Sequence, residues 1–208
     1  DRAIEIKPDY DSAWNNRGVV LGNLGRFEEA LASYDRAIEI KPDYDSAWNN
    51  RGGLLDNLGR FEEAIASYDS ALKIKPDYDS AWNNRGGSLD NLGRFEEALA
   101  SFDSALKIKP NYDSAWNNRG VALVNLGRFE EAIASFDSAL KIKPDYQPWC
   151  NRGVVLGNLG RFEEAIASYD SALKLKPDYD SAWNNRGVAL VNLGRFEEAI
   201  ASYDSALK

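Results

Sequence analysis

The sequence Trp14-Asn15-Asn16-Arg17-Gly18 recurs along the chain and decides its architecture. It returns unchanged at 48–52, 82–86, 116–120 and 183–187, and one further copy reads Trp149-Cys150-Asn151-Arg152-Gly153. The tryptophans therefore stand at positions 14, 48, 82, 116, 149 and 183, a period of 34 residues that is broken once by a step of 33. A fixed period of this size indicates a repeat protein, in which each unit packs only against its neighbours.

The period divides the 208 residues into six repeats, which we expect to form a single array over residues 1–208. Residues 1–10 have the same sequence as residues 35–44, so they are expected to be the tail of a preceding repeat. The six repeats span residues 11–44, 45–78, 79–112, 113–146, 147–179 and 180–208, the last of which is shortened. Because the chain begins within a repeat and contains no Met, we expect it to be part of a longer protein.

Each repeat is predicted to form two helices. In the first repeat, helix one is expected over about residues 12–24, with Asp11 or Ser12 as its N-cap. Gly25 is suited to the left-handed conformation that ends a helix. Helix two is expected to begin near Phe27 and to end near residue 40, because Pro42 cannot continue a helix. The sequence therefore predicts a helix–turn–helix hairpin in every repeat.

Helical periodicity assigns the core of each hairpin. At about 100° per residue, Trp14, Gly18 and Leu21 share one face of the first helix. Ala30 and Tyr34 belong to an apolar stripe at i, i+4 spacing on the second helix. We expect the small residues to let the paired helices approach closely, and the large ones to fill the layers between neighbouring hairpins.

Composition limits the classes of function. The net charge of −8 opposes binding to nucleic acid or to anionic membranes, and no apolar run approaches the ~18 residues of a membrane helix. The chain has no His, the commonest general base and metal ligand. We therefore expect no enzymatic activity, no metal and no cofactor. The single Cys fits a reducing compartment, so a cytoplasmic location is expected.

The repeat resembles the tetratricopeptide repeat, in a bacterial-type array. The residues that carry the resemblance in the first copy are Trp14, Gly18, Leu21, Ala30, Tyr34, Ala37 and Pro42, and the set recurs in later copies. The resemblance implies an all-α, right-handed superhelical solenoid of hairpins. It also implies that first helices line a concave groove that holds peptides or protein segments.

One departure from the family pattern is systematic: Arg17 and its counterparts replace the usual Leu before the Gly, which gives an Asn-Arg-Gly variant of the first helix. We expect the stem of this Arg to pack between hairpins. Its guanidinium is expected to meet an acid such as Asp35 or Glu39 on the neighbouring second helix.

The repeated asparagine pair is the main candidate for binding, because its residues are expected on the face away from the core Trp. An amide has donors and an acceptor, so a row of amides can hydrogen-bond the backbone of an extended peptide. Asparagine ladders in the repeat arrays of O-linked sugar transferases look similar. The alternative is that these residues are solvated or fix the neighbouring hairpin by hydrogen bonding. The candidates are Asn15, Asn16, Asn49, Asn50, Asn83, Asn84, Asn117, Asn118, Asn151, Asn184 and Asn185.

Differences between the copies indicate a zoned groove. The second and third repeats carry Gly and then Asp56 or Asp90 at the groove-facing positions, where the fourth repeat carries Val121 and Val124. Close approach of a ligand and drift on an exposed face are both compatible with these glycines. The aspartates make a basic or amide-rich partner the better guest. The Lys and Arg with which chaperone-type members of the family grip a C-terminal carboxylate are absent from the matching positions.

We therefore expect a non-catalytic scaffold that binds an extended peptide or protein segment, at the asparagines together with Asp56, Asp90, Val121 and Val124. A structural spacer, a self-associating rod and an accessory domain of a larger protein are the alternatives. The apolar face of the last helix has no following hairpin, which predicts homo-association through terminal repeats. Cys150 is expected to be exposed and incidental, in a repeat of irregular geometry.

Overall fold

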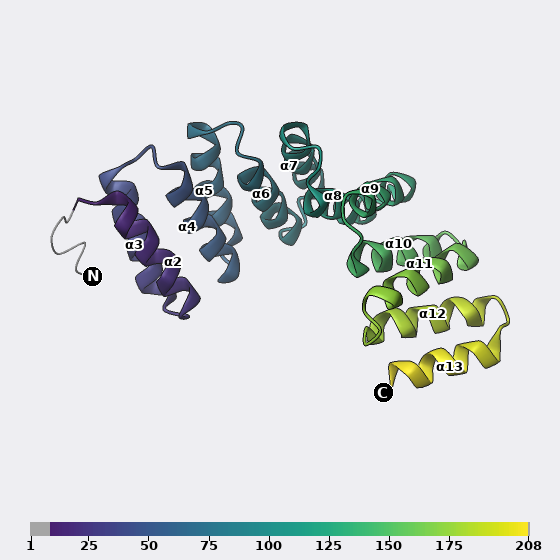
Figure 1. Ribbon diagram of the computed structural model, residues 1–208. Helices are drawn as coiled ribbons and strands as arrows, with labels where there is room; N and C mark the ends of the chain where they lie inside the picture. The colour runs from purple at the N-terminus through teal and green to yellow at the C-terminus, as the bar shows by residue number, and fades with distance from the viewer. Residues whose placement is uncertain (1–8, 208) are drawn as a thin grey trace. The chain divides into compact units, whose positions relative to one another are not determined.

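The computed structural model describes residues 9–207, and all regular secondary structure in that range is α-helical (Figure 1). The helices pack as successive hairpins, so the expected all-α solenoid architecture is confirmed. Of the predicted repeat tail, residues 1–10, the first eight lie outside the described range. The chain divides into two compact units, unit 1 up to residue 110 and unit 2 from residue 111.

Each unit contains three hairpins, and each hairpin has a first and a second helix. The helices of unit 1 are α2 (Asp11–Asn23), α3 (Phe27–Ile40), α4 (Asp45–Asn57), α5 (Phe61–Ile74), α6 (Asp79–Asn91) and α7 (Phe95–Ile108). Those of unit 2 are α8 (Asp113–Asn125), α9 (Phe129–Ile142), α10 (Tyr146–Asn158), α11 (Phe162–Leu175), α12 (Asp180–Asn192) and α13 (Phe196–Ala206).

The ends of the first helix depart slightly from the prediction. Tyr10 occupies the N-cap of α2, with no side-chain capping bond, and Asp11 is the first helical residue. The proposed Asp11 or Ser12 cap is therefore wrong. As part of the first turn, the Asp11 carboxylate instead faces the positive end of the helix dipole. The C-terminal prediction is confirmed, because Gly25 has φ 73° and the Arg26 N–H donates to the Leu21 carbonyl at 2.9 Å.

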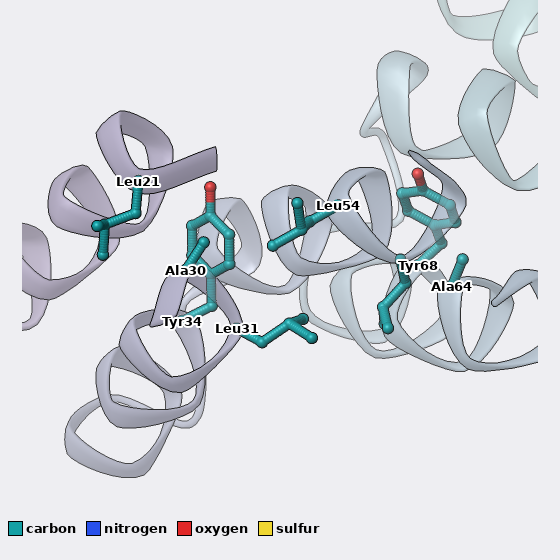
Figure 2. Packing of buried hydrophobic residues seen from close by; sticks show 8 residues of the cluster. Leu21, Ala30, Leu31, Tyr34, Leu54, Ala64 and Tyr68 are labelled. Atoms are coloured by element: carbon teal, nitrogen blue, oxygen red, sulfur yellow. The ribbon is translucent and has the colours of Figure 1, made fainter. Parts of the chain in front are cut away.

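Each hairpin closes around a glycine that faces an aromatic ring. A Cβ atom on Gly18 would lie 2.6 Å from Cε1 of Tyr34, closer than a side chain allows, so the two helices approach at a distance that only glycine permits. Figure 2 shows Leu31 and Leu54 in the space between Tyr34 and Tyr68, members of one buried cluster. The close approach predicted from small residues is confirmed.

Neighbouring hairpins stack in a fixed order within each unit. The second helix of one hairpin packs against the first helix of the next, as α3 does on α4 and α11 on α12. Consecutive first helices also touch, as α2 and α4 do. The indole N–H of Trp48 donates to the Pro42 carbonyl at 3.0 Å, which holds the turn between hairpins against the following helix. First helices therefore line one continuous face of each unit.

The repeated Arg ties three helices together. Arg51 Nε donates to Asp35 Oδ1 of the preceding second helix at 2.8 Å, which confirms the expected acid. Arg51 Nη1 also donates to Ser67 Oγ of its own hairpin at 2.8 Å. Ser67 is buried and donates in turn to the Glu63 carbonyl at 2.9 Å, a role that sequence reasoning did not anticipate. Equivalent ties join Arg85 to Asp69, Arg152 to Asp137 and Arg186 to Asp170.

The shortened fifth repeat is locally irregular, as expected. Its first helix, α10, begins at Tyr146, whereas the corresponding Tyr179 is the N-cap of α12. Asp145 takes the N-cap position, and its carboxylate accepts a hydrogen bond from the Gln147 N–H at 3.1 Å. Pro148 lies in the first turn, where proline is tolerated. Because the helix begins one position earlier in the repeat, at Tyr146, α10 has the same length of 13 residues as α12 despite the deletion.

Candidate functional site

The paired asparagines bond to one another between neighbouring first helices. In unit 1, Asn50 Nδ2 donates to Asn15 Oδ1 at 3.0 Å. Asn84 Nδ2 donates to Asn49 Oδ1 at 3.4 Å. In unit 2, the Asn151 amide donates to Asn117 Oδ1 at 3.1 Å. In these three places the second Asn of one repeat is tied to the first Asn of the preceding repeat, which is the structural role that the sequence left open.

Longer contacts join the two members of a pair. The Asn15 amide lies 3.4 Å from Asn16 Oδ1, and the Asn83 amide lies 3.5 Å from Asn84 Oδ1. Unit 2 repeats the contact between Asn117 and Asn118 at 3.4 Å. We call these residues the asparagine ladder. Because an amide group has two N–H donors and two lone pairs, one such bond leaves each amide with capacity for another partner.

The ladder is less exposed than the sequence suggested. Asn15 is only 6% exposed, so the expectation that it faces an open groove is wrong. It is covered because α4 packs beside α2 and brings Asn50 onto its carbonyl oxygen. Asn16 and Asn184 are exposed. The half-buried candidates are Asn49, Asn50, Asn83, Asn84, Asn117, Asn118, Asn151 and Asn185.

A cleft of about 510 Å³ opens on the first helices of unit 1. This volume is within the range of about 300–1,000 Å³ that is typical of ligand sites. Of the predicted binding residues, it brings together Asn49, Asn50, Asp56 and Asn84. We call it the unit 1 cleft, and its lining consists of Val19, Gly22, Asn23, Tyr34, Asn49, Asn50, Gly53, Leu54, Asp56, Asn57, Tyr68 and Asn84.

Asp56 is held in the unit 1 cleft by two hydroxyl groups. Tyr68 Oη donates to Asp56 Oδ2 at 2.6 Å, and Ser88 Oγ donates to Asp56 Oδ1 at 2.6 Å. Burial raises the pKa of Asp56 above its ordinary value, and the two hydrogen bonds oppose that rise in pKa. Burial is also the main cause that raises the pKa of Tyr68, followed by the hydrogen bond to Asp56.

Sequence reasoning missed the two hydroxyls that hold Asp56. One signal was available: position 88 is a serine, whereas the same position in the other repeats carries an apolar residue (Val20, Leu54, Ala122, Val155 and Ala189). Ser88 is buried, with 1% exposure. A buried polar residue at a repeat position that is otherwise apolar indicates a specific partner.

The remaining candidates lie outside the unit 1 cleft. Asp90 is half-buried on α6, and Val121 and Val124 are half-buried on α8. None of the three lines the unit 1 cleft, so the structure does not join Asp90 to Asp56 in a single cavity there.

Unit 2 has its own cleft on the first helices, of about 350 Å³. Val154 and Val188 line it together with Phe162, Tyr169 and the candidate Asn185. A smaller cavity of about 130 Å³ includes the ladder residues Asn117 and Asn118. The cleft at α10–α12 is therefore richer in apolar side chains than the unit 1 cleft, although the valines that line it are not Val121 and Val124.

Cys150 is not on an exposed face, contrary to the expectation. It is 5% exposed, and burial raises the pKa of its thiol. A side-chain hydrogen bond with Tyr179 lowers that pKa and makes the smaller contribution. The Tyr179 ring also packs edge-on against the Tyr146 ring, with centroids 5.0 Å apart. The thiol occupies the position of the first ladder asparagine, where the next hairpin covers it.

Within residues 9–207, no group of three or more Cys, Asp or Glu side chains is arranged to hold a metal ion. None of the helices in this range combines the length and the apolar character that crossing a membrane requires.

Comparisons with known proteins place the chain in a family. The model of the tetratricopeptide repeat matches residues 1–45, 16–79, 51–113, 83–146 and 150–208. The chain therefore belongs to the tetratricopeptide repeat family, whose members are commonly scaffolds that mediate protein interactions. No curated protein sequence matches it.

Solved structures share the fold. YrrB, described as a TPR protein with an unusual peptide-binding site, is 25% identical with a TM-score of 0.72, over 87% of this chain and 94% of YrrB. PilF of Pseudomonas aeruginosa is 20% identical with a TM-score of 0.81, over 93% and 88% of the two chains. A thermophilic TPR protein of Thermus thermophilus is 23% identical with a TM-score of 0.66, over 92% and 99%.

Proposed function

We propose that this chain is a non-catalytic scaffold that binds an extended peptide segment along its first helices. The observation that carries the proposal is the unit 1 cleft, where the amides of Asn49, Asn50 and Asn84 border one cavity of about 510 Å³. Amides at regular spacing along adjacent helices suit a peptide backbone, which presents donors and acceptors in alternation.

The structurally similar protein YrrB supports the proposal that the groove binds a peptide. Its structure is described as having a peptide-binding site, and it matches most of this chain. The segment that binds here is expected to be basic or amide-rich, because Asp56 is the charged side chain of the unit 1 cleft.

A structural spacer is the second candidate, and one observation favours it. The ladder amides bond to one another across repeats, so part of their hydrogen-bonding capacity already serves to align the hairpins. In that case the cleft would be empty, and the amides would fix the spacing of first helices. The two functions differ in whether filling the cleft has any consequence for binding.

The decisive experiment fills the unit 1 cleft without disturbing the fold. Peptides that bind the full chain are selected from a library of random linear sequences. Their affinities for the parent chain and for the Gly53→Val variant are then measured by fluorescence anisotropy. Gly53 lines the cleft, and an added Cβ meets only Tyr68 Oη at 3.8 Å, an ordinary contact. Val19 and Val121 occupy the same helix position in other repeats, so the helix accommodates the side chain.

Gly87→Val is the matched control. Gly87 occupies the same position on α6, outside the unit 1 cleft, and an added Cβ there meets nothing within 4 Å. Gly53→Val should weaken peptide binding by about tenfold or more, as expected when buried ligand contacts are lost, and Gly87→Val should leave it unchanged. Failure to select any peptide, or equal binding by both variants and the parent chain, would favour the spacer.

A further inference from the structure

Asp56 presents a fixed carboxylate to the unit 1 cleft. Its two oxygens each accept one short hydrogen bond, from Tyr68 Oη and from Ser88 Oγ, both at 2.6 Å. The donors come from α5 and α6, so the carboxylate is oriented from both sides. A carboxylate has about four lone-pair directions, and these two bonds leave acceptor capacity for a third group.

Comparison of the repeats indicates that the two hydroxyl groups at Asp56 are particular to this pair of repeats. Ser88 is the only polar residue at its repeat position, and its hydroxyl reaches Asp56 of the preceding repeat. The Tyr68 ring packs on Gly52 as the Phe102 ring packs on Gly86, with a corresponding atom 2.6 Å from the added Cβ in both cases. Phenylalanine thus satisfies the packing, and the hydroxyl of Tyr68 is available for Asp56.

The electrostatics of the cleft favour a positive ligand group. Among the described residues that line the cleft, Asp56 is the only acid and no Lys or Arg is present. The other titratable side chains of the lining are Tyr34 and Tyr68, and burial raises the pKa of both, so they are neutral near pH 7. Burial also raises the pKa of Asp56, the sign of a carboxylate whose lost hydration is incompletely replaced. A cation placed beside it would restore that stabilisation.

We propose that Asp56, Tyr68 and Ser88 form a subsite that takes one Lys or Arg side chain of the bound peptide. Val19 and Leu54 line the same cleft and offer apolar surface to the methylene stem of such a side chain. The inference rests on the proposed function, and it assigns the partner a chemistry: an extended segment with a basic residue that enters the unit 1 cleft.

The test uses labelled pools of short linear peptides, randomised except at a central residue. That residue is Lys in one pool, Arg in a second, acetyl-lysine in a third and Glu in a fourth, and the full chain is titrated by fluorescence anisotropy. Acetyl-lysine keeps the length of lysine and removes its charge. The Lys pool, the Arg pool or both should bind about tenfold more tightly than the acetyl-lysine pool, as a charge-assisted hydrogen bond provides, and the Glu pool should bind most weakly.

Two substitutions localise the preference. Asp56→Asn should abolish the discrimination between the Lys and acetyl-lysine pools, and the position tolerates change because Gly22 and Val124 occupy it in other repeats. Asp77→Asn removes the same charge from an exposed turn of unit 1 and should retain the discrimination. Tyr68→Phe, which the Phe102 packing shows to be compatible with the fold, should reduce the preference without altering the helical circular dichroism.

The outcomes separate the two proposals. If no pool binds, the proposed function is wrong, and the subsite with it. If the pools bind without a preference for positive charge, only the subsite is wrong. A third result is that the preference for positive charge survives Asp56→Asn, or that Asp77→Asn removes it equally. Either outcome would show that the preference comes from the overall negative charge of the chain, and the subsite would again be wrong.

Discussion

Two adjacent glycines of α4, Gly52 and Gly53, should respond in opposite directions to the same added methyl group. Either substitution to Ala gains about 1 kcal/mol of helix propensity. At Gly53 the new Cβ would meet only Tyr68 Oη at 3.8 Å, so the whole gain should be retained. We therefore expect Gly53→Ala to raise the free energy of unfolding by about 1 kcal/mol.

At Gly52 the added Cβ would lie 2.6 Å from Cε1 and 2.8 Å from Cζ of Tyr68. The Tyr68 ring is fully buried and cannot turn aside without displacing its neighbours. Overpacking of a core costs about 1–3 kcal/mol. After the gain in helix propensity is subtracted, Gly52→Ala should lower the free energy of unfolding by up to about 2 kcal/mol.

Urea denaturation of the full chain, followed by circular dichroism, measures both changes. Gly86→Ala and Gly87→Ala repeat the pair on α6, where the ring is Phe102 and has no hydroxyl. The same opposite signs there would assign the effect to ring packing rather than to the hydrogen bond of Tyr68. If Gly52→Ala and Gly53→Ala moved the unfolding midpoint in the same direction by similar amounts, the close approach of ring and helix would be refuted.

Three further predictions follow from other contacts. Arg51→Ala should lower the free energy of unfolding, measured by urea denaturation, by about 1–2 kcal/mol, because it removes hydrogen bonds to Asp35 and Ser67 from a side chain that is 22% exposed. Arg60→Ala is the control, since it removes a solvent-exposed ion pair. An equal effect of the two substitutions would contradict the prediction. Burial raises the pKa of Asp56 from its ordinary 3.8, so the folded chain holds this proton more tightly than the unfolded chain does. The free energy of unfolding of the parent chain minus that of Asp56→Asn should therefore rise as pH falls from neutral toward 4, and a fall would show that the sign is wrong. The Cys150 thiol is 5% exposed, so its reaction with a thiol reagent should be at least about tenfold slower in the native chain than in denaturing urea, and equal rates would contradict its burial.

The fold followed from the sequence because each of its determinants is local and repeated. Gly25 can adopt the left-handed backbone that ends the first helix, and Pro42 cannot extend the second. The hairpin boundaries were therefore predicted to within about one residue. The Arg51 tie to Asp35 was also predictable, since it needs only the order of helices and opposite charges.

The candidate site was harder to predict because it depends on contacts between repeats. Helical periodicity assigns Asn15 to a face, but it does not tell how closely α4 covers that face. For the same reason Cys150 was placed on the surface, although the next hairpin buries it. The hydroxyls of Tyr68 and Ser88 meet Asp56 from two other helices, and that meeting depends on the geometry of stacking rather than on any pattern within one helix.

The Arg ties have a direction, and this bears on how such a chain changes length. Each second helix offers an acceptor such as Asp35, and each following first helix brings a donor such as Arg51. Deletion of residues 45–78 would present Asp35 to Arg85, an identical pairing, because the excised segment is one full period. Loss or gain of one full 34-residue repeat would thus keep an Asp–Arg pairing at the new junction. The number of hairpins can therefore change while the Asp–Arg pairing is kept. A gain or loss of a few residues instead shifts the start of a helix, as it does in α10.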